Sequence, residues 1–389
     1  MAEHALLSPS SASRWLNCTP SARLTESFPG TTSAAAEEGT LAHALCEVKA
    51  AWGLGLRDLH EGKQTLDELL ASPLYTKEMD DCSDVYVAYL ADLYMRAKKR
   101  SKDANVMLET RLDFTEYVHE GFGTADGVIY ADGILEVVDF KYGKGVPVSS
   151  EDNAQLKIYG LGALNMFALL YDIHTVRLHI VQPRIDNTSC WEIATLDLLE
   201  WGENELKVKA KIAFAGEGPF ITGSHCRFCP AAAQCKTLAE HNLMLAKYEF
   251  LKANLLKPAE VADILTRAPG FKTWITSVEN YALEAALQGE EIPGYKVVEG
   301  RSVRAISDAD GLVAKIVEAG YPESLCWERK FATLTALEAA IGKKTFKELS
   351  APYITKPQGK PTLVPESDKR PALSSAQSAI NDFKNVKND

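Results

Sequence analysis

Residues 121–145, GFGTADGVIYADGILEVVDFKYGKG, contain the polar side chains best placed for chemistry. Lys141 follows Asp139 by two, so in a strand both point to the same face. If the chain turns at Asp132-Gly133, Asp126 lies nearly opposite Asp139. Two carboxylates at one point suit Mg²⁺ or Mn²⁺, and such an ion polarises a phosphate oxygen and activates a water. Lys141 would supply positive charge to the nucleophile or the phosphate. The alternative is an ordinary exposed ion pair, because D-x-K strings are common.

Three cysteines form a second group that could take part in metal or redox chemistry. Cys226, Cys229 and Cys235 lie in the string HCRFCPAAAQC, and the chain has eight cysteines in all. Three soft ligands near the start of a helix need a fourth partner. Zinc would use His225 or His241, whereas an iron–sulfur cluster would use a distant cysteine.

The elements around these residues follow an α/β pattern. The Asp-Gly pair between two apolar runs predicts a hairpin. Helix, three strands, helix and strand then follow in order, which predicts a sheet covered by helices. We expect helices over 34–52, 79–100, 152–170 and 195–214, and strands over 106–112, 123–130, 134–140 and 176–181.

After about residue 245 the predicted structure is mostly helical. Helical segments are expected over 258–266, 271–287, 308–318 and 334–341. The tail is rich in Pro, Lys, Ser and Asp, which predicts an extended or disordered segment. We therefore expect four parts: 1–104, an N-terminal helical segment that completes the site; 105–245, the core with the cysteine group; 246–350, a helical region; and 351–389, the tail.

Composition excludes several classes of protein. The 389 residues are 46% hydrophobic and 24% charged, with a net charge of −11, which is typical of a globular protein without a generally basic surface. Two lysine- and arginine-rich runs, 96–102 and 207–211, are read as solvated helix faces. No apolar stretch reaches the length of a membrane span, and residues 1–15 lack the features of a secretory signal. We expect a cytoplasmic protein.

The chain resembles the RecB-type branch of the PD-(D/E)XK nuclease superfamily. Asp126 matches the first motif, Asp139-Phe140-Lys141 the (D/E)-x-K motif, and Gln155 and Tyr159 the Q-x-x-x-Y motif on the next helix. Gly39 to His43 fits the G-x-x-x-H pattern of an upstream helix. The resemblance implies a restriction-endonuclease-like core with a mixed central sheet. It also implies a metal site of His43, Asp126 and Asp139 with a backbone carbonyl near Phe140.

In that branch the Gln155 and Tyr159 positions contact the site and the DNA strand. Glu47 and Glu109 are further carboxylates that could join the site, although solvated side chains are the more ordinary expectation for both. The motifs as a set, in the family's order and on the expected elements, carry the resemblance.

The cysteines resemble those of the iron–sulfur members of this branch, which include the AddB nuclease domain and the CRISPR adaptation nucleases. These place one cysteine before the core and three after it. The resemblance implies a [4Fe–4S] cluster held by Cys18, Cys226, Cys229 and Cys235. Cys46 is the other upstream candidate, but only Cys18 precedes the G-x-x-x-H helix. Residues 18 and 226–235 should then meet in space, and the cluster should be structural.

The resemblance implies a Mg²⁺- or Mn²⁺-dependent DNA nuclease of a phage or prophage family, with a preference for exonuclease action on ends or single strands. A phage single-strand-binding or recombination protein is the expected partner. A non-catalytic DNA-end-binding or assembly factor with the same fold is the alternative function. A zinc-stabilised protein without nuclease activity is a third.

Overall fold

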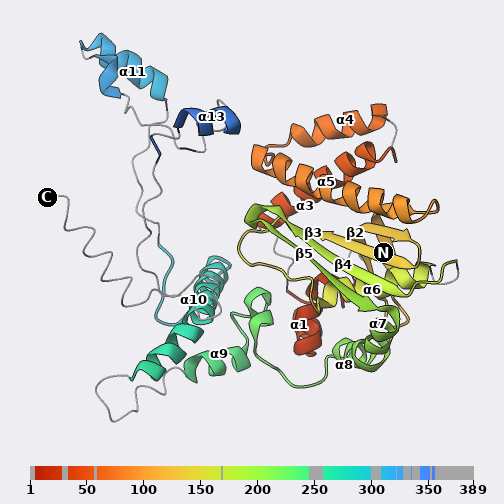
Figure 1. Ribbon diagram of the computed structural model, residues 1–389. Helices are drawn as coiled ribbons and strands as arrows, with labels where there is room; N and C mark the ends of the chain where they lie inside the picture. The colour runs from red at the N-terminus through yellow and green to blue at the C-terminus, as the bar shows by residue number, and fades with distance from the viewer. Residues whose placement is uncertain are drawn as a thin grey trace, which may run out of the picture. The chain divides into compact units, whose positions relative to one another are not determined.

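The computed structural model describes residues 5–28, 34–56, 59–167, 170–244, 257–298, 308–320, 322–326, 334, 342–350 and 353–354. By their contacts the residues form two compact units, Met1–Val298 and Glu299–Asp389. The first unit contains the sheet and all the residues of the predicted sites. Figure 1 shows its elements.

The centre of the first unit is a five-stranded mixed sheet in the order β1-β2-β3-β4-β5. Strands β3 and β4 are parallel, and the other neighbours are antiparallel. The connection between the parallel pair is the helix α6, as parallel strands require a crossover. The strands are β1 (Asn105–Asp113), β2 (Phe122–Ala131), β3 (Ile134–Phe140), β4 (Thr175–Gln182) and β5 (Asn187–Ala194).

Helices cover both faces of the sheet, and each face has its own core. On one face α3 (Ala34–Gly53) and α5 (Lys77–Arg100) pack over β2 and β3, and α4 (Leu59–Leu70) packs on α3. On the other face α6 (Ala154–Phe167) packs across β1 to β4. Figure 1 shows the two helical layers with the sheet between them. The expected α/β fold with a mixed sheet flanked by helices is therefore confirmed.

The N-terminal segment joins the α6 layer. It consists of the 3₁₀ turn η1 (Pro9–Ser11) and the short helices α1 (Ala12–Asn17) and α2 (Ser21–Leu24), which pack on α8. The helix after β5 is continuous but contains a π turn: α7 (Thr195–Trp201), η3 (Gly202–Leu206) and α8 (Lys207–Ala215). Next come the 3₁₀ turn η4 (Ser224–Phe228), α9 (Lys236–Leu243) and the long α10 (Pro258–Leu287).

Most predicted elements form close to their expected bounds. The hairpin turns at Asp132 and Gly133, whose φ angles of 51° and 72° belong to a type I′ turn. Strand β5 and helix α4 were not expected. The two segments predicted over 258–266 and 271–287 form one helix, because α10 continues through Pro269.

The second unit is helical where it is described. It contains α11 (Ala309–Glu318), the 3₁₀ turn η6 (Glu323–Cys326) and α13 (Lys343–Ser350). The predicted helix 308–318 corresponds to α11. The predicted helix 334–341 and the tail 351–389 lie almost entirely outside the described residues. The four-part division of the chain stays a prediction.

Candidate functional site: a carboxylate row and a four-cysteine cavity

Three acidic residues lie in one row across neighbouring strands. Strand β1 pairs Leu108 with Gly127, and β2 pairs Gly127 with Val138. One position further along each ladder, Glu109 is opposite Asp126 and Asp126 is opposite Asp139. The alignment of Asp126 with Asp139 follows from the two-residue turn, as the sequence predicted.

The strands are irregular at this row. Ala125 and Val128 both belong to the core on the α6 face, although they are three positions apart. In a regular strand only alternate positions share a face, so the alternation of β2 reverses between them, at Asp126. In β1 the opposite residue, Glu109, has a left-handed φ of 42°, which is rare for a residue with a side chain. The irregularity lies at the carboxylate row, where ligand atoms of Glu109 and Asp126 come within 4.8 Å of each other.

Asp126 connects strand β3 with helix α3. Its Oδ2 accepts a hydrogen bond of 2.7 Å from the backbone N–H of Phe140. Its Oδ1 lies 3.2 Å from Nδ1 of His43, on α3. The His43 ring packs edge-on against the fully buried Phe140 ring, with centroids 5.3 Å apart. Phe140 therefore orients both the carboxylate and the imidazole.

The predicted Lys141 lies on the α6 side of the site. Its Nζ donates a hydrogen bond of 2.9 Å to Oε1 of Gln155 and lies 2.9 Å from Oδ2 of Asp139. Nε2 of Gln155 is in turn 3.5 Å from the hydroxyl of Tyr159. Gln155 and Tyr159 are four residues apart on α6 and therefore share a helix face. The helix thus holds the lysine ammonium beside the carboxylate row.

Burial and neighbouring charges shift the pKa values of His43, Glu109 and Asp139. Burial opposes protonation of His43, but the charge of Asp126 and its hydrogen bond outweigh burial and raise the pKa of His43 to about 9. Burial, and then the charge of Asp126, raise the pKa of Glu109 to about 7. Burial also raises the pKa of Asp139 against the opposing charge of Lys141. A cation among these groups would stabilise the ionised carboxylates of Glu109 and Asp139 against burial and the like charge of Asp126.

The donor atoms suit a hard divalent ion. Ligand atoms of His43, Glu109 and Asp126 all lie within 4.8 Å of one another. Oδ2 of Asp139 is buried, pairs with Lys141 only as an ion pair, and has no hydrogen-bond partner among the described residues. Two or three carboxylates with one imidazole match the ligands of Mg²⁺ and Mn²⁺. This acidic cluster could therefore hold a divalent metal.

The structure differs from the predicted ligand set in one respect. Asp139 is absent from the set of mutually close ligand atoms found among the described residues, and Glu109 is present. The carboxylate of Asp139 is turned to Lys141. Glu109 was expected to be a solvated side chain, but it is half-buried and faces Asp126. No local sequence signal identifies it, because the register of β1 with β2 is not set by the turn at Asp132-Gly133.

The four predicted cysteines line one small cavity. Cys18, at the C-terminal end of α1, faces Cys226 and Cys229 of the η4 segment and Cys235 at the start of α9. Two hydrogen bonds hold the N-terminal segment nearby: Thr19 Oγ1 to the carbonyl of Glu217 (2.6 Å) and Arg23 Nε to that of Phe214 (2.7 Å). Residues two hundred positions apart therefore meet, as expected.

Other candidate ligands lie elsewhere. Cys46 is buried in the core between α3 and α5. His225 lines the cysteine cavity, but its Nε2 lies 2.9 Å from the carbonyl oxygen of Ile221. His241 lines a different pocket, next to α10. Burial raises the pKa of the Cys229 thiol, although Arg14, which also lines the cavity, opposes the shift.

No helix among the described residues has both the length and the apolar character needed to cross a bilayer. The structure thus gives no sign of a membrane-spanning helix in the parts of the chain that it covers.

Comparisons with solved structures give weak similarities. One is the crystal structure of a protein called SSO0001, with 14% identity and a TM-score of 0.23, over 50% of this chain and 84% of that chain. Another is a protein from Eubacterium rectale named "Putative exonuclease", with 11% identity and a TM-score of 0.30, over 66% of this chain and 92% of that chain. Both scores are below 0.5, so neither similarity supports a statement on function.

The match to a protein-family model covers much more of the chain. The model of a family described as "Protein of unknown function (DUF2800)" matches residues 4–371. This match includes the carboxylate row, the four cysteines and most of the helical C-terminal region. The chain therefore belongs to the DUF2800 family.

Proposed function

We propose that this protein is a Mg²⁺- or Mn²⁺-dependent DNA nuclease of the RecB-like PD-(D/E)XK type. The observation that carries the proposal is the meeting of Asp126, Asp139, Lys141 and His43 at one place, from two strands and a helix. The order of these residues in the sequence resembles that of the nuclease motifs. Their contacts provide both hard oxygen ligands and a fixed positive charge.

The proposed metal ligands are His43, Glu109, Asp126 and Asp139. The carbonyl of Phe140 is a further candidate. A bound divalent ion would supply Lewis acidity for a phosphate oxygen and for water. The carboxylates carry the negative charge that selects such an ion. Phe140, through its N–H and its ring, keeps Asp126 and His43 in fixed orientations.

Lys141 is proposed to stabilise negative charge on the nucleophile or on the phosphate. Its ammonium is held by Asp139 and Gln155, and burial in this setting strengthens its electrostatic effect. Asp139 raises the pKa of Lys141 against the effect of burial, so the lysine keeps its charge. Gln155 positions the lysine, and Gln155 and Tyr159 are proposed to contact the DNA strand.

We further propose that Cys18, Cys226, Cys229 and Cys235 hold a [4Fe–4S] cluster. A single zinc ion with bonds of about 2.3 Å needs its sulfur ligands within about 4 Å of one another. Among the described residues, no three of these sulfurs come within 4.8 Å of each other. A four-iron cluster takes one thiolate at each iron and so spreads the sulfurs further apart. The cluster would join the N-terminal segment to the η4–α9 segment.

Action at DNA ends or on single strands is the finer proposal, and it rests on the resemblance to cluster-containing RecB-type nucleases. Phage DNA replication or recombination is the setting that this resemblance favours, with a single-strand-binding or recombination protein as partner. Product ladders from end-labelled DNA separate this mode from internal cleavage.

The test is cleavage of end-labelled single- and double-stranded DNA with Mg²⁺ or Mn²⁺. We expect cleavage by the wild type and a loss of at least about 100-fold in Asp139→Ala and Lys141→Ala. Lys144→Ala is the matched control, because Lys144 is an exposed lysine in the same segment. Folded wild type that cleaves neither DNA with either metal, or an Asp139→Ala variant as active as wild type, would overturn the proposal.

A further inference from the structure

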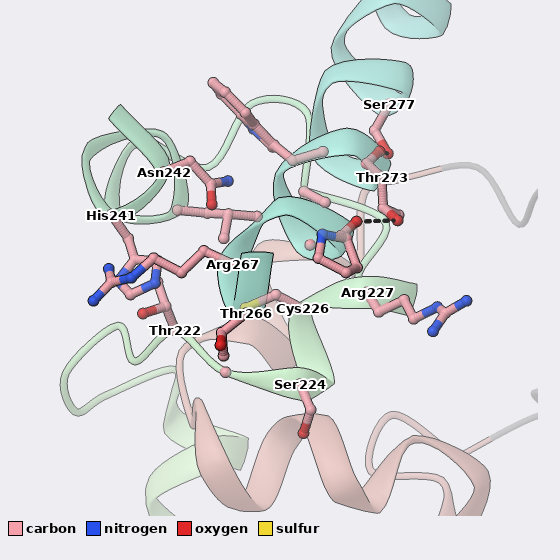
Figure 2. A pocket seen from close by; sticks show the side chains of 16 residues that line it. Thr222, Ser224, Cys226, Arg227, His241, Asn242, Thr266, Arg267, Thr273 and Ser277 are labelled. Carbon is pink, nitrogen blue, oxygen red and sulfur yellow. Dashed lines mark hydrogen bonds between the residues drawn. The ribbon is translucent and has the colours of Figure 1, made fainter. Parts of the chain in front are cut away.

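A pocket of about 400 Å³ lies between the cysteine segment and α10 (Figure 2). Its lining comes from the η4 region, from α9 and from one side of α10. We call it the α10 pocket and define it by Cys226, Arg227, Asn242, Arg267 and Trp274. Its volume is typical of a site for a small organic ligand. It shares no lining residue with the carboxylate row.

Two buried donors in this pocket lack partners. Asn242 is only 9% exposed, and its Nδ2 has no hydrogen-bond partner among the described residues. The same holds for Nε1 of Trp274. An indole N–H can only donate, and a buried donor without an acceptor is unfavourable. A ligand that provides acceptor atoms would satisfy the hydrogen-bonding capacity of both donors.

The charge of the pocket favours an anion. Arg227, Arg267 and His241 line it, and none of its sixteen lining residues is acidic. The chain has 53 Asp and Glu among 389 residues, so about two would be expected in a random set of sixteen. Arg267 Nε pairs at 2.8 Å with Asp263, one turn earlier on α10. That contact uses Nε and orients the guanidinium, and its two terminal nitrogens have no hydrogen bond or ion pair among the described residues.

The remaining lining is polar and partly aromatic. Hydroxyl groups of Thr222, Ser224 and Thr266 add donors and acceptors, and the Trp274 ring adds an aromatic surface. An anionic ligand that carries many acceptors and fits beside an aromatic ring has the chemistry of a nucleotide. Base–aromatic contacts and arginine–phosphate contacts are the usual means of binding single strands.

We propose that the α10 pocket binds one nucleotide of single-stranded DNA. The phosphate is recognised by Arg267, which Figure 2 shows beside His241, and the base by Asn242 and Trp274. The proposal rests on the proposed nuclease function, because DNA is the substrate there. It assigns strand binding to α10, which lies outside the nuclease-like motifs described above. Cys226 lines both this pocket and the cysteine cavity, so the same segment supports cluster and strand.

The experiment measures binding of a fluorescein-labelled dT12 oligonucleotide by anisotropy, without added divalent metal, so that cleavage does not enter. The variants are Trp274→Phe, which keeps a ring but removes the N–H, Asn242→Leu and Arg267→Gln. Matched controls are Trp191→Phe, a half-buried tryptophan of β5, and Arg177→Gln, whose guanidinium pairs with Glu192 at 2.8 Å. Melting temperatures identify any variant that fails to fold.

We expect each pocket variant to weaken dT12 binding by about 5- to 10-fold, the effect of one lost hydrogen bond or ion contact. The controls should stay within about twofold. In cleavage assays KM should rise by the same factor while kcat is unchanged. Folded Trp274→Phe and Asn242→Leu variants with wild-type affinity would overturn the proposal, as would a wild type that does not bind dT12.

The two proposals fail in different ways. If the protein binds dT12 through Asn242 and Trp274 but cleaves no DNA, the proposal for the α10 pocket stands and the nuclease proposal fails. If the protein cleaves DNA with a metal but the pocket variants bind dT12 normally, the nuclease proposal stands and the proposal for the α10 pocket fails.

Discussion

Glu109 lies opposite Asp126 in the register of β1 and β2, with a left-handed backbone and a carboxylate close to that of Asp126. Like charges directly opposite one another on a sheet are destabilising. Burial and the charge of Asp126 raise the pKa of Glu109 to about 7. Such an arrangement costs stability unless a cation joins it, which makes Glu109 the most informative residue of the row.

The Glu109→Gln variant should bind Mn²⁺ about 10-fold more weakly than wild type, because it removes one charged ligand from the set. Glu47→Gln is the control, since Glu47 lies on α3 near Glu109 but outside the set of close ligand atoms. Isothermal titration calorimetry gives both affinities. Equal affinity of Glu109→Gln and wild type would remove Glu109 from the proposed ligands.

Cys229→Ser should lose iron and sulfide and lower the melting temperature, whereas Cys46→Ser should retain both. A cross-link that closes a long loop is worth about 3–4 kcal/mol, which corresponds to about 10 °C. Cys46 is the matched control because it is buried but lies in the α3–α5 core. Metal analysis, sulfide assay and thermal unfolding of anaerobically purified protein give the comparison. A Cys229→Ser protein with full iron content and wild-type stability contradicts the cluster assignment.

We expect Glu136 to make a pH-dependent contribution to the stability of the fold. It is 2% exposed, with Oε1 2.6 Å from Arg100 and Oε2 3.3 Å from His179. Burial opposes its ionisation, but the hydrogen bonds and charges of His179 and Arg100 prevail and hold its pKa below the ordinary 4.5. Its stabilisation is therefore complete above pH 4.5 and is lost as the pH falls through the lower, folded-state pKa.

Glu136→Gln should accordingly lower the free energy of unfolding by about 3 kcal/mol at pH 7, and by less at pH 3.5. Urea unfolding at the two pH values measures the difference. Glu192→Gln, which breaks the exposed Arg177–Glu192 pair on the same sheet, should cost less than about 1 kcal/mol. A difference between Glu136→Gln and wild type that does not change with pH would show that shape, and not charge, is what Glu136 contributes.

The sequence determined the part of the site that depends on local geometry. A type I′ turn at Asp132-Gly133 sets the register of β2 and β3, so the alignment of Asp126 with Asp139 follows from counting residues. The two-residue period of a strand places Lys141 beside Asp139. The four-residue spacing on α6 likewise places Gln155 near Tyr159. Each of these relations spans a single turn or helix, where the pattern and the geometry agree.

The tertiary structure alone decided what depends on packing between distant segments. The left-handed Glu109 enters the carboxylate row because β1 pairs with β2 at one particular register, and no local pattern marks that conformation. His43 reaches Asp126 because α3 packs on the Phe140 ring. The α10 pocket exists because α10 packs against the cysteine segment. Only the folded structure shows that the Asn242 and Trp274 donors have no partner among the residues it describes.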